Sequence, residues 1–558
     1  MADPNLNALW CRAIAEELAR AGVTRVIGCP GSRNSPLLFA LSAVFGDRLH
    51  MAIDERGAAF HALGMAKVGV VTAVCVTSGT AAANLLPAVC EAHASGQPLI
   101  LITADRPADL HGVGAPQTME QRSLFGVFAT AVALAEPTAT DHALCSLREL
   151  VSRSVQEAHG PVQFNVPLRD PLPPLPDPTW TRPTLSTEAE RGRAGPFVRI
   201  ESRPSFPDAS IAAPFLRPGL RGLIVAGSES EACAPLIPML ASLSGYPVLA
   251  DAISGLRRPA VPNLVASLDA LADSALGREQ ADVIIRIGAP PLARASYEWV
   301  AKQRCPQLVL GGDRNRDFIG TATMQWPLVN DAFVAELGRR CATGDATWTA
   351  RWKAAEKQAQ EQRQRTASAQ GWSEPAAYAL ACAQSDFPLL WLASSMPVRH
   401  ANLHVSPSTQ RQRVLSNRGV NGIDGTVASF LGATRASGQR GLCLIGDLAL
   451  LHDLNSLALA SGTRGGVLVV NNGGGGIFDA LPVAQVDGYR RLVRTDHDLD
   501  FSHAAAQFRL PYRRCAAIAE LSVALAEAAT SESMLLIECA LTGRDMIADH
   551  RAVLAAMR

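Results

Sequence analysis

The sequence lacks the features that mark several broad classes of protein. Its 558 residues carry 51 basic and 51 acidic side chains, so no net charge favours nucleic acid as a partner. No uninterrupted apolar stretch approaches the roughly 18 residues that a transmembrane helix needs. The amino-terminal helical pattern contains Glu16 and Glu17, which a secretory signal peptide would not. We therefore expect a protein of the cytoplasm, with no membrane span and no nucleic-acid partner.

Cysteine, although present, forms none of the usual patterns. The 12 cysteines contain no C-x-x-C pair and no His/Cys cluster at zinc spacing. Cys75, Cys443 and Cys539 fall inside apolar runs that predict strands, so we expect buried thiols in a reducing compartment. No G-x-G-x-x-G follows the apolar run at 222–227, which argues against a nicotinamide or flavin site there.

What the sequence does contain is a repeated alternation of short apolar runs with helical patterns. Each run ends in turn residues, as expected for parallel sheets with helices on both faces. The predicted strands are 25–28, 72–77, 98–103 and 162–166 in a first unit, 222–227, 247–251, 283–288 and 307–313 in a second, and 389–393, 413–416, 441–445, 467–470 and 534–539 in a third. The predicted fold is therefore α/β, with three doubly wound parallel-sheet domains.

The predicted boundaries follow shifts in composition. They are an amino-terminal domain at 1–180, a proline-rich linker at 181–220, a central domain at 221–345, an exposed linking helix at 346–374 and a carboxyl-terminal domain at 375–558. The linker is rich in proline and lacks periodicity, which is typical of an extended, semi-rigid connection.

The stretch 446–478 is the most informative part of the chain. Two apolar runs end in the polar pairs Gly446-Asp447 and Asn471-Asn472, and a helical pattern joins them. This order predicts a strand–helix–strand crossover in which the two parallel strands lie side by side. Ligands of α/β sheets bind at the carboxyl ends of such strands.

The residues at these strand ends point to one kind of chemistry. Asp447 supplies a carboxylate and Asn472 an amide oxygen, and both suit Mg²⁺ that also binds phosphate. The four glycines after Asn472 let a ligand approach the backbone. A diphosphate ester held through magnesium is therefore the first hypothesis. The alternative is a solvated loop edge, because any doubly wound fold ends strands in Asp, Asn and Gly.

Six stretches strengthen this hypothesis when they are taken together. They are CPGSRNSPL (29–37), DERGAAFHALGMAK (54–67), TSGTAAANLLPAVCEA (77–92), LITADRPADL (101–110), SNRGVNGIDG (416–425) and GDLALLHDLNSLAL (446–459). Each is weak alone, because tight turns and helix caps use the same residues. In this order they closely resemble the 2-succinyl-5-enolpyruvyl-6-hydroxy-3-cyclohexene-1-carboxylate synthase family, thiamine-diphosphate-dependent enzymes of the menaquinone pathway. The magnesium-diphosphate motif is similar too, although Leu448 replaces its usual third glycine.

The resemblance implies thiamine diphosphate, held through Mg²⁺ or Mn²⁺, as the cofactor. Glu55 matches the glutamate that pairs with the pyrimidine nitrogen N1′ and makes the cofactor's own N4′ a base. Asp447, Asn472 and the Gly474 carbonyl match the metal ligands, and Ile423 matches an apolar wedge beneath the cofactor. Without the resemblance, Glu55 could be an exposed carboxylate at a helix start and Ile423 a core side chain. Further cofactor contacts that the resemblance implies are Ser32, Thr80, Gly446, Leu448, Ile477 and Phe478.

The implied reaction makes the protein a transferase. It decarboxylates 2-oxoglutarate and adds the resulting succinic semialdehyde carbanion to isochorismate in a Stetter-like 1,4-addition. Both substrates are dicarboxylates, so the site needs fixed cations, and arginine pairs with carboxylates bidentately. The implied substrate residues are Arg33, Arg106, Gln117, Arg294, Ser395, Arg399 and Arg418. Taken singly, each arginine could equally be a surface salt-bridge partner.

Glu55 and Asp447 lie in different units, yet related enzymes bring both to one cofactor across a subunit boundary. We therefore expect a homodimer or a dimer of dimers, with the active site at the subunit interface. Two alternatives remain. One is a different thiamine-diphosphate-dependent 2-oxo acid decarboxylase or an acetolactate-type synthase, against which the arginines argue. The other is a non-catalytic binding homologue, against which the intact Glu55, Asp447 and Asn472 argue.

Overall fold

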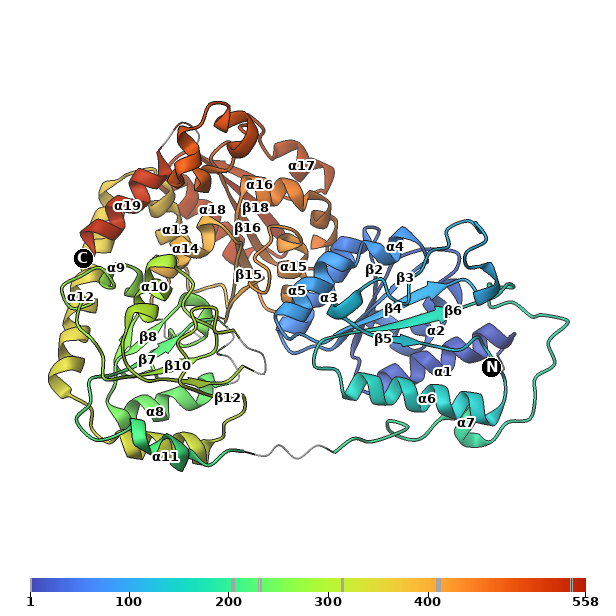
Figure 1. Ribbon diagram of the computed structural model, residues 1–558. Coiled ribbons are helices and arrows are strands. Elements are labelled where there is room, and N and C mark those ends of the chain that lie inside the picture. Colours follow the sequence, from blue (N-terminus) through green and yellow to red (C-terminus); the bar gives the residue numbers. More distant parts are fainter. Residues whose placement is uncertain are drawn as a thin grey trace. The chain divides into compact units, whose positions relative to one another are not determined.

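The computed structural model describes residues 3–201, 206–228, 230, 233–312, 316–407, 413–541, 543 and 545–558 (Figure 1). These residues form three six-stranded sheets in which every pair of neighbouring strands is parallel. The predicted α/β class with three doubly wound parallel sheets is confirmed. The chain divides into two compact units: residues 1–202, 417–438 and 452–463 form unit 1, and residues 203–416, 439–451 and 464–558 form unit 2.

Unit 1 contains the first sheet, with strand order β2-β1-β3-β4-β6-β5. Its strands are β1 (Arg25–Gly28), β2 (Leu49–Met51), β3 (Thr72–Val76), β4 (Leu99–Asp105), β5 (Thr130–Ala133) and β6 (Pro161–Pro167). Its helices are α1 (Leu6–Arg20), α2 (Ser35–Phe45), α3 (Glu55–Lys67), α4 (Thr80–Ala83), α5 (Leu86–Ala94), α6 (Asp141–Gln156), α7 (Thr187–Arg191) and α15 (Thr426–Ser437).

Helices cover both faces of this sheet because alternate strand residues point to opposite sides. Cys75 and Ile102 pack into a core with side chains of α1, α2 and α6. Val74 and Leu101 pack into a second core with side chains of α3 and α5 (Figure 1). All strands run in one direction, so their carboxyl ends share one edge of the sheet.

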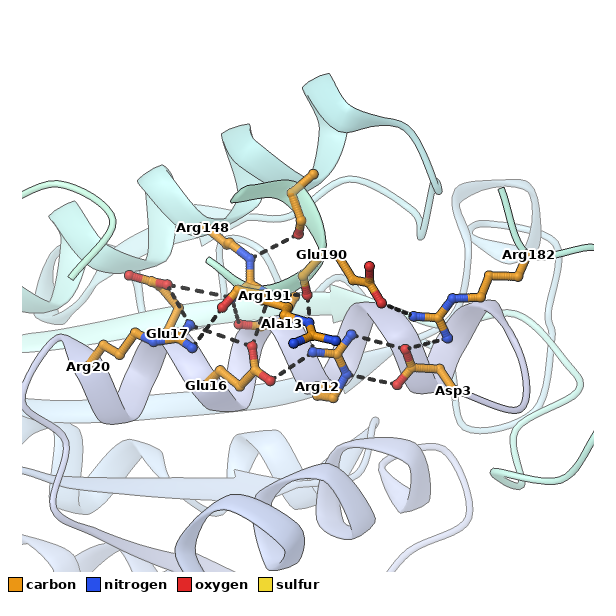
Figure 2. Close-up of polar contacts among 11 residues, drawn as sticks. Asp3, Arg12, Ala13, Glu16, Glu17, Arg20, Arg148, Arg182, Glu190 and Arg191 are labelled. Atoms are coloured by element: carbon orange, nitrogen blue, oxygen red, sulfur yellow. Dashed lines mark hydrogen bonds and ion pairs between the residues drawn. The ribbon is translucent and has the colours of Figure 1, made fainter. Parts of the chain in front are cut away.

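An ion network joins α1, α6 and the segment around α7 (Figure 2). The buried Arg148 of α6 donates to the Glu16 carboxylate at 2.9 Å and to the backbone carbonyls of Ala189 and Glu190. Glu16 also pairs with Arg12 at 2.7 Å. Breaking a buried ion pair on one side leaves an uncompensated charge, so this network holds the segment firmly on the sheet's helices. The beginning of the predicted linker at 181–220 is therefore packed against unit 1.

Helices α3 and α15 pack against each other at glycine contacts. A Cβ on Gly64 would lie 1.8 Å from the carbonyl oxygen of Ser429, so only glycine fits this crossing. The Ser429 hydroxyl donates to the Phe60 carbonyl at 3.0 Å. The buried Asp453 carboxylate accepts the backbone N–H of Val427, at 2.8 Å, at the start of α15. The start of α15 is thereby fixed within unit 1.

Unit 2 contains the other two sheets, with strand orders β12-β11-β10-β7-β8-β9 and β14-β13-β15-β16-β18-β17. The strands of the second sheet are β7 (Gly222–Ala226), β8 (Val248–Ala250), β9 (Leu264–Val265), β10 (Val283–Ile287), β11 (Gln307–Leu310) and β12 (Met324–Trp326). The strands of the third sheet are β13 (Leu389–Leu392), β14 (Arg413–Ser416), β15 (Gly441–Gly446), β16 (Gly465–Asn471), β17 (Tyr512–Cys515) and β18 (Met534–Ala540). The predicted strand at 307–313 ends at Leu310, and residue 313 itself lies outside the described residues.

The helices of unit 2 separate these strands. They are α8 (Ile237–Ser244), α9 (Leu268–Leu271), α10 (Arg294–Lys302), α11 (Asp331–Cys341), α12 (Ala346–Ala369), α13 (Glu374–Cys382), α14 (Met396–His404), α17 (Ser502–Gln507), α18 (Ile518–Thr530) and α19 (Met546–Ala556). Helix α16 (Asp447–His452) begins in unit 2, and the helical pattern that follows it is a 3₁₀ segment, Leu454–Ala460.

Helix α12 differs from the exposed helix expected at 346–374. Trp348 and Trp352 are buried and pack in a core with Trp299 and with strand residues of the second sheet. Their indole rings meet edge to face, with centroids 5.8 Å apart. Because most residues of the helix are polar, its apolar stripe could not be recognised from composition. This stripe packs the helix against the central sheet.

Cys75, Cys443 and Cys539 are buried, as predicted, and no cysteine of the described chain forms a disulfide. Among the helices that the structure describes, none combines the length and the apolar character that crossing a bilayer requires.

Candidate functional site

The carboxyl edge of the first sheet carries several of the predicted residues. Ser32 and Arg33 follow β1, Thr80 follows β3, and Arg106 follows β4 directly. Because β1, β3 and β4 are parallel neighbours, these residues share one edge. Ser32 and Thr80 are exposed, and the two arginines are half-buried.

Glu55 begins helix α3 beside this edge. Asp54 caps the helix, since its carboxylate accepts the backbone N–H groups of Arg56 and Gly57 at 3.0 and 3.2 Å. That capping leaves the half-buried Glu55 carboxylate with one hydrogen bond among the described residues, from the Asn84 amide at 3.3 Å. Glu55 is thus an acid on a rigid element with capacity for a further partner.

Polar side chains support this edge of the sheet, and one of them, Gln121, was not predicted from the sequence. The buried Gln121 accepts the backbone N–H of Gly79 at 2.7 Å and donates to Asn165 at 3.1 Å. The predicted Gln117 donates to the Ser78 carbonyl at 3.0 Å, and the Arg106 guanidinium donates to the Ser78 hydroxyl. Residues 78–80 are therefore fixed from several sides.

Arg33 is held in place by the segment after β6. Its guanidinium donates to the Leu168 carbonyl at 2.8 Å and lies 3.1 Å from the Asp170 carboxylate. Its Nε is buried and has no hydrogen-bond partner in the described chain. The side chain thus retains donor capacity at the sheet edge.

The loop 417–425, which carries Arg418 and Ile423, is anchored by Glu91 of α5. The buried Glu91 carboxylate accepts the backbone N–H groups of Gly419 and Val420, both at 2.8 Å. Arg418 and Ile423 are half-buried. Glu91 was not predicted as a site residue, because a glutamate within a helical pattern gives no sign of a contact 328 residues away.

The second group of residues lies at the carboxyl edge of the third sheet. Strands β15 and β16 are parallel neighbours, as predicted for the crossover, so Asp447 and Asn472 follow adjacent strand ends. The buried Asp447 carboxylate accepts the backbone N–H groups of Asn472 and Gly474, each at 3.0 Å, and of Leu448 at 2.6 Å. Burial raises the pKa of Asp447, and these donors oppose the rise.

Asn472 carries an unpaired acceptor. Its Oδ1 atom is buried and has no hydrogen-bond partner among the described residues. A buried amide oxygen without a partner costs free energy, which a bound cation or donor would recover. His497 Nε2 lies 3.4 Å from Asp447 Oδ2.

Arg494 holds the glycine run after Asn472 in place through hydrogen bonds. The Arg494 guanidinium donates to the carbonyls of Asn472 and Gly473, both at 3.3 Å, and its own carbonyl accepts the Gly475 N–H at 2.6 Å. Gly474 has a φ of +143°, where a side chain would be strained and a Cβ would lie 2.8 Å from the Arg494 carbonyl oxygen. The run is therefore a fixed cradle whose shape requires glycine.

The donor set at this edge fits a hard divalent cation and a diphosphate. Asp447 and Asn472 provide oxygen atoms, Gly474 provides a backbone carbonyl, and such ligands suit Mg²⁺. No group of three or more His, Cys, Asp or Glu that could hold a metal exists in the part of the chain that the structure describes. The predicted set needs only one such residue, Asp447. The remaining predicted contacts nearby are Gly446, Leu448, Ile477 and Phe478, all half-buried.

Three further predicted substrate residues lie in unit 2, namely Ser395, Arg399 and Arg294. Ser395 follows β13 with a φ of +75°, and its carbonyl accepts the Arg399 guanidinium at 2.6 Å. Burial lowers the pKa of Arg399. The Arg294 side chain is 81% exposed and pairs with Glu298 of its own helix at 2.6 Å, lining a surface cavity of about 720 Å³.

A family model for the amino-terminal thiamine pyrophosphate binding domain of thiamine pyrophosphate enzymes matches residues 11–124. This match assigns residues 11–124 to the amino-terminal domain of thiamine pyrophosphate enzymes, and the three parallel sheets are consistent with that class.

Relatives named 2-succinyl-5-enolpyruvyl-6-hydroxy-3-cyclohexene-1-carboxylate synthase match nearly the whole chain. One from Myxococcus xanthus is 40% identical over 534 residues, covering 90% of this chain and 89% of its own. One from Halobacterium salinarum is 36% identical over 578 residues, covering 99% and 98%. One from Geobacillus kaustophilus is 36% identical over 526 residues, covering 90% and 89%. The chain belongs to the 2-succinyl-5-enolpyruvyl-6-hydroxy-3-cyclohexene-1-carboxylate synthase family.

Proposed function

We propose that the protein decarboxylates 2-oxoglutarate and adds the four-carbon unit to isochorismate, forming 2-succinyl-5-enolpyruvyl-6-hydroxy-3-cyclohexene-1-carboxylate for menaquinone biosynthesis. The observation that carries this proposal is the arrangement of Asp447, Asn472 and Gly474 at adjacent strand ends, in a chain that belongs to this family. The full length of the match supports the particular reaction over other reactions of the same cofactor.

The cation is Mg²⁺ or Mn²⁺, because oxygen ligands admit both. The Asp447 carboxylate, the Asn472 amide oxygen and the Gly474 carbonyl would hold it. The buried, unpartnered Oδ1 of Asn472 supports this assignment. The cation would also favour the ionised form of Asp447, which burial alone disfavours.

When bound, thiamine diphosphate supplies a nucleophilic carbon and a sink for the electrons released by decarboxylation. Glu55 holds the pyrimidine through a hydrogen bond at N1′ and keeps a proton there. Asn84 orients the Glu55 carboxylate by its hydrogen bond. Ile423 supports the cofactor as an apolar wedge. Ser32, Thr80, Gly446, Leu448, Ile477 and Phe478 complete the proposed cofactor contacts.

The arginines recognise the carboxylates of the two substrates. Arg33 and Arg106 stand at the edge of the first sheet, and both are fixed by hydrogen bonds. Arg418 follows β14 on the anchored loop. Fixed guanidinium groups lose little freedom on binding, which favours bidentate pairing with dicarboxylates. Gln117, Arg294, Ser395 and Arg399 complete the proposed substrate set.

The active form is a homodimer or a dimer of dimers in the cytoplasm. Glu55 of one chain and Asp447 of the partner subunit serve one cofactor. Met51 and Ile53, which precede Glu55, are 54% and 88% exposed, and such apolar side chains are typical of a surface that another chain covers. The proposed domains within each chain keep the boundaries predicted from sequence, 1–180, 221–345 and 375–558.

The test is an assay of purified protein with 2-oxoglutarate and isochorismate. Loss of isochorismate absorbance and the mass of the product are recorded with thiamine diphosphate and Mg²⁺ together and with each omitted in turn. We expect turnover only in the complete mixture. Turnover of 2-oxoglutarate with isochorismate left unconsumed would instead indicate a simple decarboxylase.

A further inference from the structure

A buried polar cluster at the carboxyl edge of the second sheet belongs to none of the contacts described above. We call it the Asp269 cluster, and it consists of Asp251, Arg257, Asp269, Ser296 and Asn402. All five residues are buried. Asp251 follows β8 directly, Asp269 lies in α9, Ser296 in α10 and Asn402 in α14, so the cluster joins four separate elements.

The cluster holds helix α14 through Asn402. The Asn402 amide donates to Asp269 Oδ2 at 2.7 Å, and its oxygen accepts the Arg257 guanidinium at 3.0 Å and the Ala252 N–H at 2.8 Å. Arg257 also donates to the carbonyls of Asn402 and Val405, at 2.7 and 2.8 Å. These contacts fix the end of α14, and the Asn402 amide donates a further, longer hydrogen bond to Asp251 Oδ1 at 3.4 Å.

The same carboxylates hold helix α10. The Ser296 hydroxyl donates to Asp269 Oδ1, so Asp269 uses one oxygen for α10 and the other for α14. Asp251 Oδ2 accepts the backbone N–H of Leu292 at 2.6 Å, just before α10 begins. Both sides of the helix start are therefore tied to the cluster.

Each of the two helices carries one of the proposed substrate arginines. Arg294 stands between Leu292 and Ser296, the two attachment points of α10. Arg399 stands three residues before Asn402, about one turn along α14. The negative charge of Asp269 also acts on Arg399 directly, because it raises the pKa of the Arg399 guanidinium against the lowering by burial.

Stability alone does not explain a cluster of this composition. Two carboxylates and a guanidinium are buried together, and apolar residues of similar volume often give equal or greater stability at such places. A fully hydrogen-bonded polar cluster does, however, impose one geometry on the elements that it joins. Here the elements that the cluster joins include α10 and α14, which carry the cationic side chains Arg294 and Arg399.

We infer that Asp269 is a positioning residue, which sets Arg294 and Arg399 relative to each other for recognition of substrate carboxylates. This role rests on the proposed function, and it adds a residue that contacts neither substrate nor cofactor. A displacement of about 1 Å at a recognition group can cost up to about 100-fold in rate, so the hydrogen bonds of Asp269 have catalytic consequences.

The test compares Asp269→Asn and Ser296→Ala with wild-type protein. Asp269→Asn keeps the shape but replaces one acceptor oxygen by a donor, which cannot accept from both Ser296 and Asn402. Ser296→Ala removes only the hydrogen bond from α10 to Asp269 and keeps the one from Leu292 to Asp251, so it is the milder change. The control is Asp282→Asn, which removes a carboxylate bonded to Arg221 at the opposite, amino-terminal edge of the same sheet.

We expect both cluster variants to raise the KM for at least one of the two substrates about tenfold, with kcat changed less. The concentration of thiamine diphosphate that gives half-maximal activity should stay within about twofold of wild type, because the cofactor contacts lie elsewhere. Asp282→Asn should leave both KM values unchanged. A role in folding alone would lower the melting temperature and the active fraction without moving KM.

The outcomes separate the two proposals. Wild-type KM values in both cluster variants would overturn the positioning role while leaving the proposed function intact. Equal loss of substrate and cofactor affinity in Ser296→Ala would also overturn it, as a general loss of structure. A wild-type protein that consumes neither substrate would overturn the proposed function, and the positioning role with it.

Discussion

The Asp447 carboxylate accepts the backbone N–H of Gly474 at 3.0 Å. This contact ties the first residue after β15 to the glycine run after β16, so two strand ends become one rigid surface. The carboxylate therefore both shapes the cradle and stands where a cation would bind. Both roles depend on the charge and on the acceptor capacity of one side chain.

Replacement of Asp447 tests the proposed metal site. Asp447→Asn removes the charge and one acceptor, so we expect affinity for Mg²⁺ in the presence of thiamine diphosphate to fall at least about 100-fold. Isothermal titration of the metal into protein with cofactor measures this directly. The control Asp386→Asn removes an exposed carboxylate before β13, at the opposite edge of the same sheet. Unchanged metal affinity in Asp447→Asn would exclude it as a ligand.

Replacement of Glu91 tests the anchor of the loop that carries Arg418. In Glu91→Gln only one of the two terminal atoms can accept a hydrogen bond, because the other is an amide nitrogen that itself donates. One of the two backbone N–H groups therefore loses its partner, at a cost of about 1–3 kcal/mol. We expect kcat/KM to fall about tenfold and the amides of 417–425 to exchange with solvent faster. The matched control is Glu157→Gln, because Glu157 forms an exposed ion pair with Arg153. Wild-type exchange in the loop of Glu91→Gln would contradict the anchoring role.

Helix α3, which begins with Glu55, depends on its close crossing with α15. Gly64→Ala places a methyl group against the Ser429 carbonyl, which neither helix can avoid without separating. We expect the free energy of unfolding to fall by at least about 2 kcal/mol, with a melting temperature lower by several degrees. Gly195 has open space around it, so Gly195→Ala should melt like wild type. Equal melting of the two variants would show that the crossing is not tight.

The ionisation of the buried Glu374 carboxyl should make the stability of the fold depend on pH. The buried carboxyl has its pKa raised to about 8 by burial, and the charges of Asp447 and Asp549 add to the rise. Because the pKa is higher in the folded than in the unfolded state, the stability from this group is fully present below its ordinary value of 4.5 and is lost as pH rises through about 8.

Glu374→Gln lacks this ionisation and mimics the neutral acid. The melting temperature of the variant, relative to that of wild type, should therefore increase by several degrees between about pH 5 and about pH 9. Thermal melts across this range measure the difference. A constant difference across the range would mean that Glu374 does not carry the raised pKa.

The sequence predicts the centre of each sheet better than its edges. The predicted strands include all the central ones, because both faces of these strands are buried and their apolar runs are nearly continuous. The strands that were not predicted are β2, β5, β9, β12 and β17, and every one of them lies at a sheet edge. Edge strands are short and partly exposed, as in β5, so they lack the apolar signal.

In the candidate site too, only some of the residues could be predicted from the sequence. Asp447 and Asn472 could be found from sequence because each directly follows an apolar run, and adjacent parallel strands bring such residues together. Arg494, Glu91 and Asp269 could not, because their contacts depend on the path of the chain far from each of them. The resemblance to a family supplied the proposed roles of Glu55 and the arginines, which local patterns leave open.

The most direct measurement of the central claim compares cofactor binding with turnover in Glu55→Gln. If Glu55 serves pyrimidine N1′, the variant should bind thiamine diphosphate and Mg²⁺ within about tenfold of wild type while isochorismate consumption falls at least about 100-fold. Titration calorimetry and the absorbance assay give the two numbers on one preparation. Turnover near that of wild type would contradict the account.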